Sequence, residues 1–167
     1  MGDTIMTEFK CHLNCTAVGE HVPEAERAIR IIKERARCIV SSWVYKNAPI
    51  TFKTSLIKFV VFWLNSIPHN DSIIPNICSK AIVVGTYPDY NKHCKLAFGS
   101  YTHVHNTRTI TNTMASRTSP AIALGPVSNL QGSYRFFCLE TKRIVIRRQF
   151  TELPLPKSVI YQINKLP

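Results

Sequence analysis

An apolar stripe with helical spacing, from Ala25 to Trp43, constrains the fold more than any other feature of this sequence. Its members recur at intervals of three and four residues: Ala25, Ala28, Ile29, Ile32, Ala36, Ile39, Val40 and Trp43. That repeat is typical of an amphipathic helix with one buried face. Pro23 comes just before the stripe, in a first-turn position that a helix tolerates. The sequence therefore predicts a helix from Glu24 to about Val44.

A second helix is predicted from Phe52 to Asn65, because this stretch is rich in large apolar residues and ends before Pro68. A polar loop follows at 68–75. Beyond it the apolar runs are short and alternate with turns, which favours strands. The strongest strand candidate is the Arg-Ile-Val-Ile-Arg-Arg segment at 143–148, and the polar stretch 106–119 is expected to be a long loop.

These patterns together predict an α+β fold, with two or three N-terminal helices followed by a small antiparallel β-barrel of about five strands. The length of 167 residues is enough for one ordinary domain or two small ones, and an apolar fraction of 45% can supply a packed core. We expect a helical unit at 1–70, a β unit at 75–155 and a tail or short helix at 156–167.

The net charge is strongly positive and unevenly distributed. Lys and Arg total 21 against 10 Asp and Glu, which gives a formal charge of +11. Residues 1–40 contain six acids and six bases, so the whole excess lies in residues 41–167. Since only 19% of the residues are charged, a tail-like polyelectrolyte is excluded. A folded basic protein has polyanions as its expected partners, nucleic acid first and an anionic membrane surface second.

No segment is typical of a secretory signal or a membrane span. The first ten residues contain two acids and no apolar core, and the longest apolar run, 59–64, is far below the roughly 18 residues that a span needs. The six cysteines form no Cys-x-x-Cys pair, which favours free thiols. We expect an intracellular protein that neither enters nor spans a membrane.

The first helix carries a motif beyond its apolar stripe. The segment Glu-His-Val-Pro-Glu-Ala-Glu-Arg-Ala-Ile-Arg-Ile-Ile-Lys-Glu-Arg-Ala-Arg, at 20–37, resembles the last active-site helix of the integrase core in copia-type LTR retrotransposon Pol polyproteins. In that family a helix bearing Glu-Arg followed by basic residues carries the third carboxylate of an Asp-Asp-Glu catalytic set. The matching residue here is Glu26. The second helix, with Phe-Trp-Leu-Asn and then Pro68, resembles the family's next element.

The β half resembles the small SH3-like domain that follows the integrase core in the same family. Four stretches carry the match: 89–95 (Asp-Tyr-Asn-Lys-His-Cys-Lys), 98–101 (Phe-Gly-Ser-Tyr), 121–134 (from Ala-Ile-Ala-Leu-Gly-Pro to Asn-Leu-Gln-Gly-Ser-Tyr) and 147–154 (Arg-Arg-Gln-Phe-Thr-Glu-Leu-Pro). With the helices, the resemblance covers residues 20–160. It implies that 1–70 is the helical remnant of an RNase H-like integrase core and that 75–155 is an SH3-like β-barrel.

The sequence departs from the family upstream of the first helix. Family integrases carry two Asp residues there, whereas only 25 residues precede Glu26 and Asp3 is the sole Asp among them. The resemblance therefore implies a fragment of an integrase. Strand transfer uses two metal ions, and Mg²⁺ held partly by Glu26 is implied for a complete parent enzyme. Because one Glu cannot hold two metals, we expect no cofactor and no independent catalysis in this chain.

Candidate DNA contacts lie in both halves. Arg30, Lys33 and Arg37 share the polar face of the first helix with Glu26, and Arg and Lys are suited to phosphate binding. Residues 92–148 contain nine bases against one acid. The bases predicted there to contact nucleic acid are Lys92, Lys95, Arg135, Lys142, Arg143, Arg147 and Arg148. The alternatives are a solvated helix face laced by charge pairs and a basic surface that serves solubility.

The expected function is therefore sequence-nonspecific DNA binding by a fragment of a retrotransposon integrase that serves DNA integration and is not catalytic alone. The resemblance implies a location in the nucleus or a cytoplasmic particle, and a homo-oligomer in the parent integrase. Three alternatives stay open. They are a polynucleotidyl transferase that is competent within a longer polyprotein, a module that binds protein, and a non-functional pseudogene product of a truncated transposable element.

Overall fold

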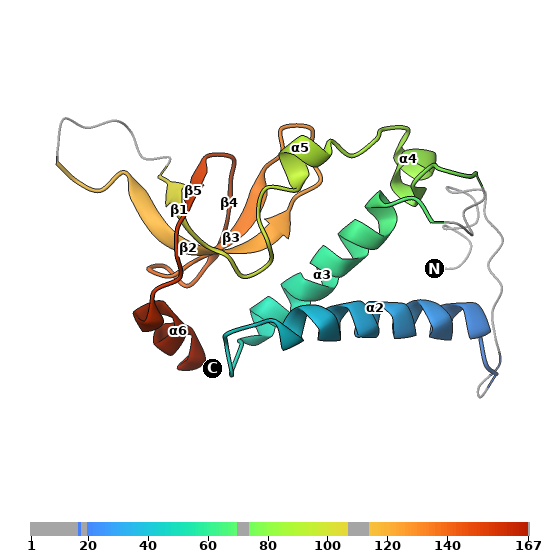
Figure 1. Ribbon diagram of the computed structural model, residues 1–167, viewed down its shortest axis with the longest axis horizontal. Coiled ribbons are helices and arrows are strands. Elements are labelled where there is room, and N and C mark those ends of the chain that lie inside the picture. The colour runs from blue at the N-terminus through green and yellow to red at the C-terminus, as the bar shows by residue number, and fades with distance from the viewer. Residues whose placement is uncertain (1–16, 18–19, 70–73, 107–113, 167) are drawn as a thin grey trace.

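The computed structural model describes residues 17, 20–69, 74–106 and 114–166. Within them the fold is α+β, with helices before an antiparallel sheet, as the sequence predicts (Figure 1). None of the helices in these ranges is long and apolar enough to span a membrane.

The first helices among the described residues are two long ones, α2 (Pro23–Ser41) and α3 (Ile50–Ser66). Both lie close to the predicted ranges. Apolar spacing identified the first, and a high content of large apolar residues before Pro68 identified the second. Three short helices follow: α4 (Ser79–Val84), α5 (Tyr90–His93) and, after the sheet, α6 (Lys157–Asn164).

In the described part of the chain, five strands form one antiparallel sheet in the order β4-β3-β2-β1-β5. Their bounds are β1 (Tyr101–His105), β2 (Thr118–Pro126), β3 (Tyr134–Cys138), β4 (Ile144–Arg147) and β5 (Phe150–Glu152). β4 falls inside the predicted strand at 143–148. β2 begins earlier than expected, because Thr118 and Ser119 pair with β1 across from His105 and Val104. The end of the predicted loop 106–119 is therefore strand, while 107–113 lies outside the described residues.

Both faces of the sheet are covered, and two hydrophobic clusters result. One cluster joins the sheet to the helices and includes Phe52 of α3, Ile163 of α6 and Phe137 of β3. The other includes side chains from all five strands, with Tyr134 and Phe136 at its centre and Phe150 packed against it. Phe136 and Phe137 point to opposite faces, as alternation requires, yet both are buried because each face has its own cluster.

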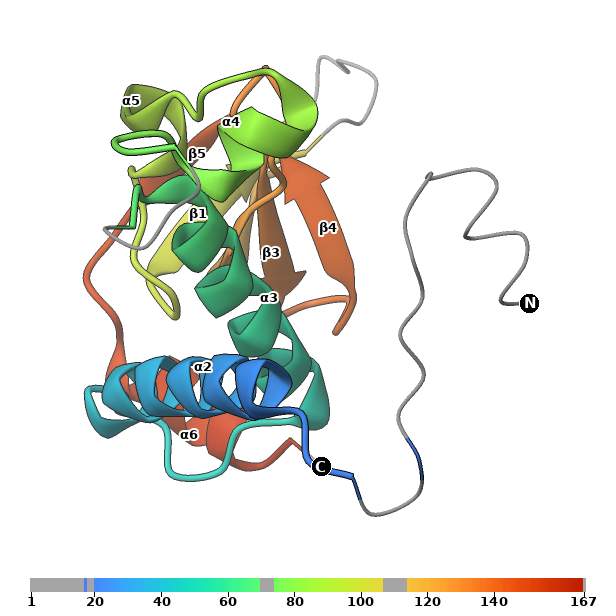
Figure 2. The same ribbon diagram turned by 90° about the vertical axis from the view of Figure 1, so that its right-hand side faces the viewer.

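Helix α3 lies across one face of the sheet, and α2 packs across α3 (Figure 2). An aromatic group fixes this junction: Trp43 stacks on Phe98 with ring centroids 5.4 Å apart, and the Tyr45 hydroxyl donates to the Gly99 carbonyl at 3.0 Å. The apolar stripe of α2 is only partly covered, since Ala36 is buried whereas Ile29 is 51% exposed. Helices and sheet share one cluster, and the predicted division at 70–75 stays a prediction.

Candidate nucleic-acid interface

The polar face of α2 gathers the residues predicted from the first motif. Glu26, Arg30, Lys33 and Arg37 line one surface hollow of about 360 Å³ together with Ile29. All five residues are exposed. The i, i+4, i+7 and i+11 spacing of the four charged residues places them on one side of a regular helix, so the long apolar stripe opposite determines where they point.

Glu26 is the only acid that lines this hollow among the described residues. Its Oε1 lies 2.8 Å from Nδ1 of His21, and both side chains are largely exposed. Mg²⁺ is held by several oxygen ligands, and the two-metal chemistry needs more than one carboxylate. Within the described ranges no three His, Cys, Asp or Glu side chains lie close enough together to hold a metal ion. The described residues therefore do not form a two-metal site of the kind that the resemblance implies for a complete parent enzyme, and Glu26 lies exposed on the surface.

A second basic hollow, of about 570 Å³, lies at the end of the sheet. It is lined by His105, Asn106, Arg147, Arg148 and Gln149. The hollow forms because the turn between β4 and β5 is tied to the end of β1: the His105 amide donates to the Gln149 carbonyl at 3.2 Å. Arg147 is held in place, with Nε donating to the His105 carbonyl at 3.1 Å. Arg148 is exposed beside it.

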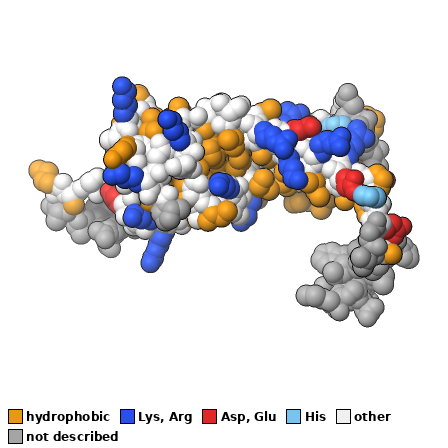
Figure 3. Space-filling model, turned by 90° about the horizontal axis from the view of Figure 1, so that it is seen from below, with side chains coloured by type: hydrophobic (Ala, Val, Ile, Leu, Met, Phe, Trp, Pro, Cys, Tyr) orange, Lys and Arg blue, Asp and Glu red, His pale blue; other side chains and the backbone are white. Residues whose placement is uncertain are grey.

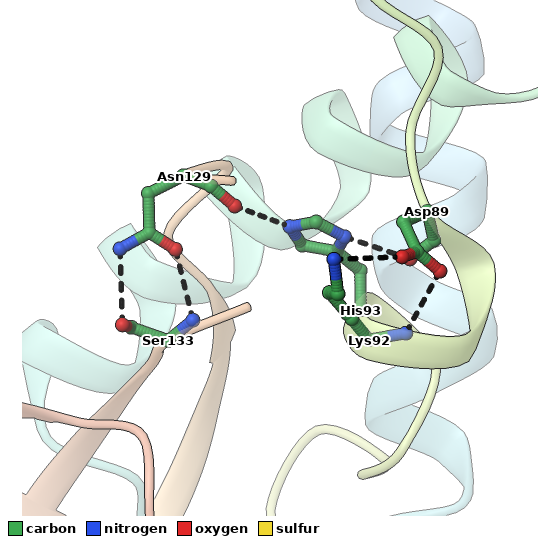
Figure 4. A network of polar contacts seen from close by, with 5 residues as sticks. All are labelled: Asp89, Lys92, His93, Asn129 and Ser133. Carbon is green, nitrogen blue, oxygen red and sulfur yellow. Dashed lines mark hydrogen bonds and ion pairs between the residues drawn. The ribbon is translucent and has the colours of Figure 1, made fainter. Parts of the chain in front are cut away.

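The junction of α5 with the turn between β2 and β3 positions Lys92 and Lys95. Figure 4 shows the polar contacts of this junction around Lys92 and His93. The ring of His93 is buried there, with Nδ1 2.8 Å from the Asp89 carbonyl oxygen and Nε2 3.0 Å from that of Asn129. The backbone amide of Lys95 donates to the Tyr134 hydroxyl at 2.9 Å. The junction therefore fixes the backbone from which both lysine side chains project into solvent.

The charge of Lys92 is partly compensated. Its Nζ lies 3.1 Å from Oδ2 of Asp89, three residues earlier. The hydrogen bond and charge of Lys92 hold the pKa of Asp89 below its ordinary value. Because both groups are exposed, this pair is a weak restraint and leaves Lys92 able to exchange the carboxylate for a phosphate.

The remaining predicted contacts differ in how far their side chains are exposed to solvent. Lys142 and Arg143 are exposed in the turn between β3 and β4. Arg135, in contrast, is half-buried on β3, and its Nη2 donates to the Pro126 carbonyl at 3.1 Å. Burial lowers the pKa of this guanidinium. Arg135 is thus held by the protein itself and is the predicted contact least able to reach a phosphate.

The structure does not gather these residues into one patch. Lys and Arg side chains cluster at the α2 end of the molecule and, separately, around the other end, with hydrophobic surface between them (Figure 3). Sequence reasoning missed His105, Asn106 and Gln149 as parts of the second hollow. No local pattern marks them, since His105 and Gln149 are joined by a hydrogen bond although they lie far apart in the sequence.

No protein-family model, curated protein sequence or solved structure matches this chain.

Proposed function

We propose that this chain binds DNA without sequence specificity, as a fragment of a copia-type retrotransposon integrase that is not catalytic alone. The observation that carries the proposal is the pair of open basic hollows, one on α2 and one at the end of the sheet. Only one acid, Glu26, lines either of them among the described residues. Arg and Lys side chains around a solvent-open hollow suit the phosphate backbone, which carries no base information.

The basic residues come from separate elements, which favours contact with an extended polyanion over a small phosphorylated ligand. A small anion needs several donors converging on one point, whereas a DNA backbone presents charges along a line. One group lies on α2 and the other at the turn between β4 and β5. A duplex is long enough to be contacted at both.

We propose further that the sheet is a small SH3-like barrel. Support comes from the hydrophobic cluster to which all five strands contribute. The strand order also supports it, because the first strand β1 lies beside the last strand β5 and the nine-residue β2 is central. Within the described residues the sheet is not closed, because β4 and β5 are its edge strands and do not pair with each other, so the barrel that we propose is a partly open one.

In this proposal Glu26 is the third carboxylate of a parent active site, and Arg30, Lys33 and Arg37 bind the DNA beside it. The other two carboxylates and Mg²⁺ belong to the complete parent enzyme. The proposed setting is the nucleus or a cytoplasmic particle, with the parent integrase as a homo-oligomer. The chain by itself retains the DNA contact and not the chemistry.

Charge removal at matched sites tests the proposal. We compare the triple variant Arg30→Gln, Lys33→Gln, Arg37→Gln with the triple variant Lys46→Gln, Lys53→Gln, Lys58→Gln, which removes the same charge from other exposed positions. Fluorescence anisotropy with a labelled duplex should show about tenfold or more weakening for the α2 variant and about threefold or less for the control. Equal weakening would mean that only the net charge matters and would contradict a localised interface.

A further inference from the structure

The two edges of the sheet differ in how they are protected. The β5 edge is three residues long, exposes Thr151 and Glu152, and is followed by Pro154 and Pro156. Short length, charge and proline are the means by which proteins keep an edge strand from pairing. The β4 edge has no proline, and the side chains of Ile144 and Ile146 are 46% and 51% exposed.

The register shows which backbone groups of β4 remain free for a further strand. The Cys138 amide donates to the Arg143 carbonyl at 3.0 Å, and Val145 and Arg147 lie opposite Phe136 and Tyr134. In an antiparallel ladder every second residue directs its N–H and C=O toward the partner strand. The groups of Val145 therefore face β3, and those of Ile144 and Ile146 face away from the sheet.

One of these outward groups already has a substitute partner from its own chain. The Ile146 carbonyl accepts a hydrogen bond from Nη1 of Arg147 at 2.8 Å. This contact is exposed, so an incoming backbone N–H can take the place of the guanidinium. The displaced Nη1 of Arg147 can then donate to a carboxylate on the incoming chain.

The charge around β4 determines what kind of peptide can pair with its open edge. The segment from Lys142 to Arg148 contains four bases and no acid, two on each side of the Ile-Val-Ile sequence. A second copy of this protein is a poor partner. An antiparallel pair that aligns Ile144 with Ile146 of the copy sets Arg143 opposite Arg147 and Lys142 opposite Arg148, and like charges directly opposite are destabilising. Acidic residues at those positions are favourable instead.

We propose that the open edge of β4 binds an extended acidic peptide by strand addition, with apolar side chains of the peptide beside Ile144 and Ile146 and its carboxylates on Arg143 and Arg147. Main-chain hydrogen bonds supply affinity in this mode, and alternate side chains supply specificity. The surface is distinct from the hollow on α2 and shares Arg147 with the hollow at the end of the sheet. The peptide proposal itself does not depend on DNA binding.

The test uses the full chain and a fluorescent peptide in which valine and glutamate alternate. Ile146→Pro removes only an outward N–H, so the β3 ladder stays intact, and Ile146→Val is the matched control. We expect Ile146→Pro to weaken peptide binding about tenfold and Ile146→Val to change it less than about twofold. Affinity for duplex DNA should be the same in both variants.

A second experiment changes the peptide and uses the wild-type chain. Its result therefore stays interpretable even if a variant misfolds. The same peptide N-methylated at alternate residues keeps its charge but loses its donors, and we expect about tenfold weaker binding. A valine–lysine peptide should not bind.

Equal binding of the methylated peptide, or no binding of the parent peptide, would overturn strand addition. A loss of DNA affinity in Ile146→Pro would assign the edge to nucleic acid, and loss of a dimer in that variant would assign it to a second copy. Either result would also overturn the proposal.

Discussion

The backbone of Gly125 lies against the ring of Phe59, so close that an added Cβ would stand 2.6 Å from Cδ2 of that ring. Gly125 has a φ of +110°, and its pairing with Arg135 marks a register shift between β2 and β3. At this contact α3 packs against β2 of the sheet. The contact therefore determines how the helical part that carries Arg30 is joined to the sheet, whose β4–β5 turn carries Arg148.

Gly125→Ala should destabilise the protein by about 3 kcal/mol, because it adds both backbone strain and a steric clash. The free energy of unfolding in denaturant measures this cost. In a Phe59→Leu background the same substitution should cost less, since a smaller side chain leaves room for the methyl group. An unchanged cost in that background would mean that backbone strain alone is responsible.

Gly132 holds α5 in place in a similar way. Its φ is +70°, and an added Cβ would stand 2.7 Å from Cβ of Lys92. Gly132→Ala should cost about 2 kcal/mol and weaken DNA binding by displacing Lys92. Gly85→Ala is a matched control, because Gly85 has a φ of +73° with nothing within 4 Å. It should cost about 1 kcal/mol and leave DNA affinity unchanged. Equal losses of stability from both substitutions would show that the close packing of Gly132 against α5 does not contribute to stability.

Burial of Tyr45 predicts a loss of stability at high pH. Desolvation raises the pKa of its hydroxyl to about 12. An unfolded tyrosine loses its proton near pH 10, so between pH 10 and 12 ionisation favours the unfolded state and stability falls. The contribution is complete below pH 10 and is lost as the pH rises through the folded value.

Tyr45→Phe separates this effect from other groups that titrate at high pH. The variant lacks the bond to the Gly99 carbonyl and should be less stable at pH 7 by about 1 kcal/mol. The difference in unfolding free energy between wild type and variant should shrink above pH 10. A constant difference up to pH 11 would contradict the assignment.

The first half of α2 should open far more readily than α3. Every side chain from Pro23 to Arg30 is exposed, whereas Phe52, Leu56 and Val60 of α3 are buried. Local stability follows buried contacts, so backbone amides at 27–31 should exchange at least about a hundredfold faster than those at 56–60. Hydrogen exchange read by NMR measures this directly, and equal protection would show that α2 opens only with the whole molecule.

Sequence patterns predicted the long elements well and the tertiary details poorly. The stripe from Ala25 to Trp43 located α2, because its one-sided burial leaves a helical repeat in the sequence. The run Ile-Val-Ile located β4. The short helix α5 was not predicted, since four residues held by the Asp89 cap and by His93 leave no periodic signal.

The candidate site was predicted only in part for the same reason. Glu26, Arg30, Lys33 and Arg37 lie on one face because helix geometry alone places them there. The second hollow depends on the contact of His105 with Gln149, which only the folded sheet brings together. Arg135 was expected to face DNA, but its guanidinium is half-buried against the Pro126 carbonyl, a position that charge counting cannot reveal.

The most direct measurement of the central claim is the affinity of the wild-type chain for two unrelated DNA duplexes across a salt series. Binding through phosphates predicts that log affinity falls linearly with log salt, with a slope of about −3 or steeper and nearly the same on both duplexes. No binding at low salt, an affinity that does not change with salt, or a preference of more than about tenfold for one duplex would contradict sequence-nonspecific DNA binding.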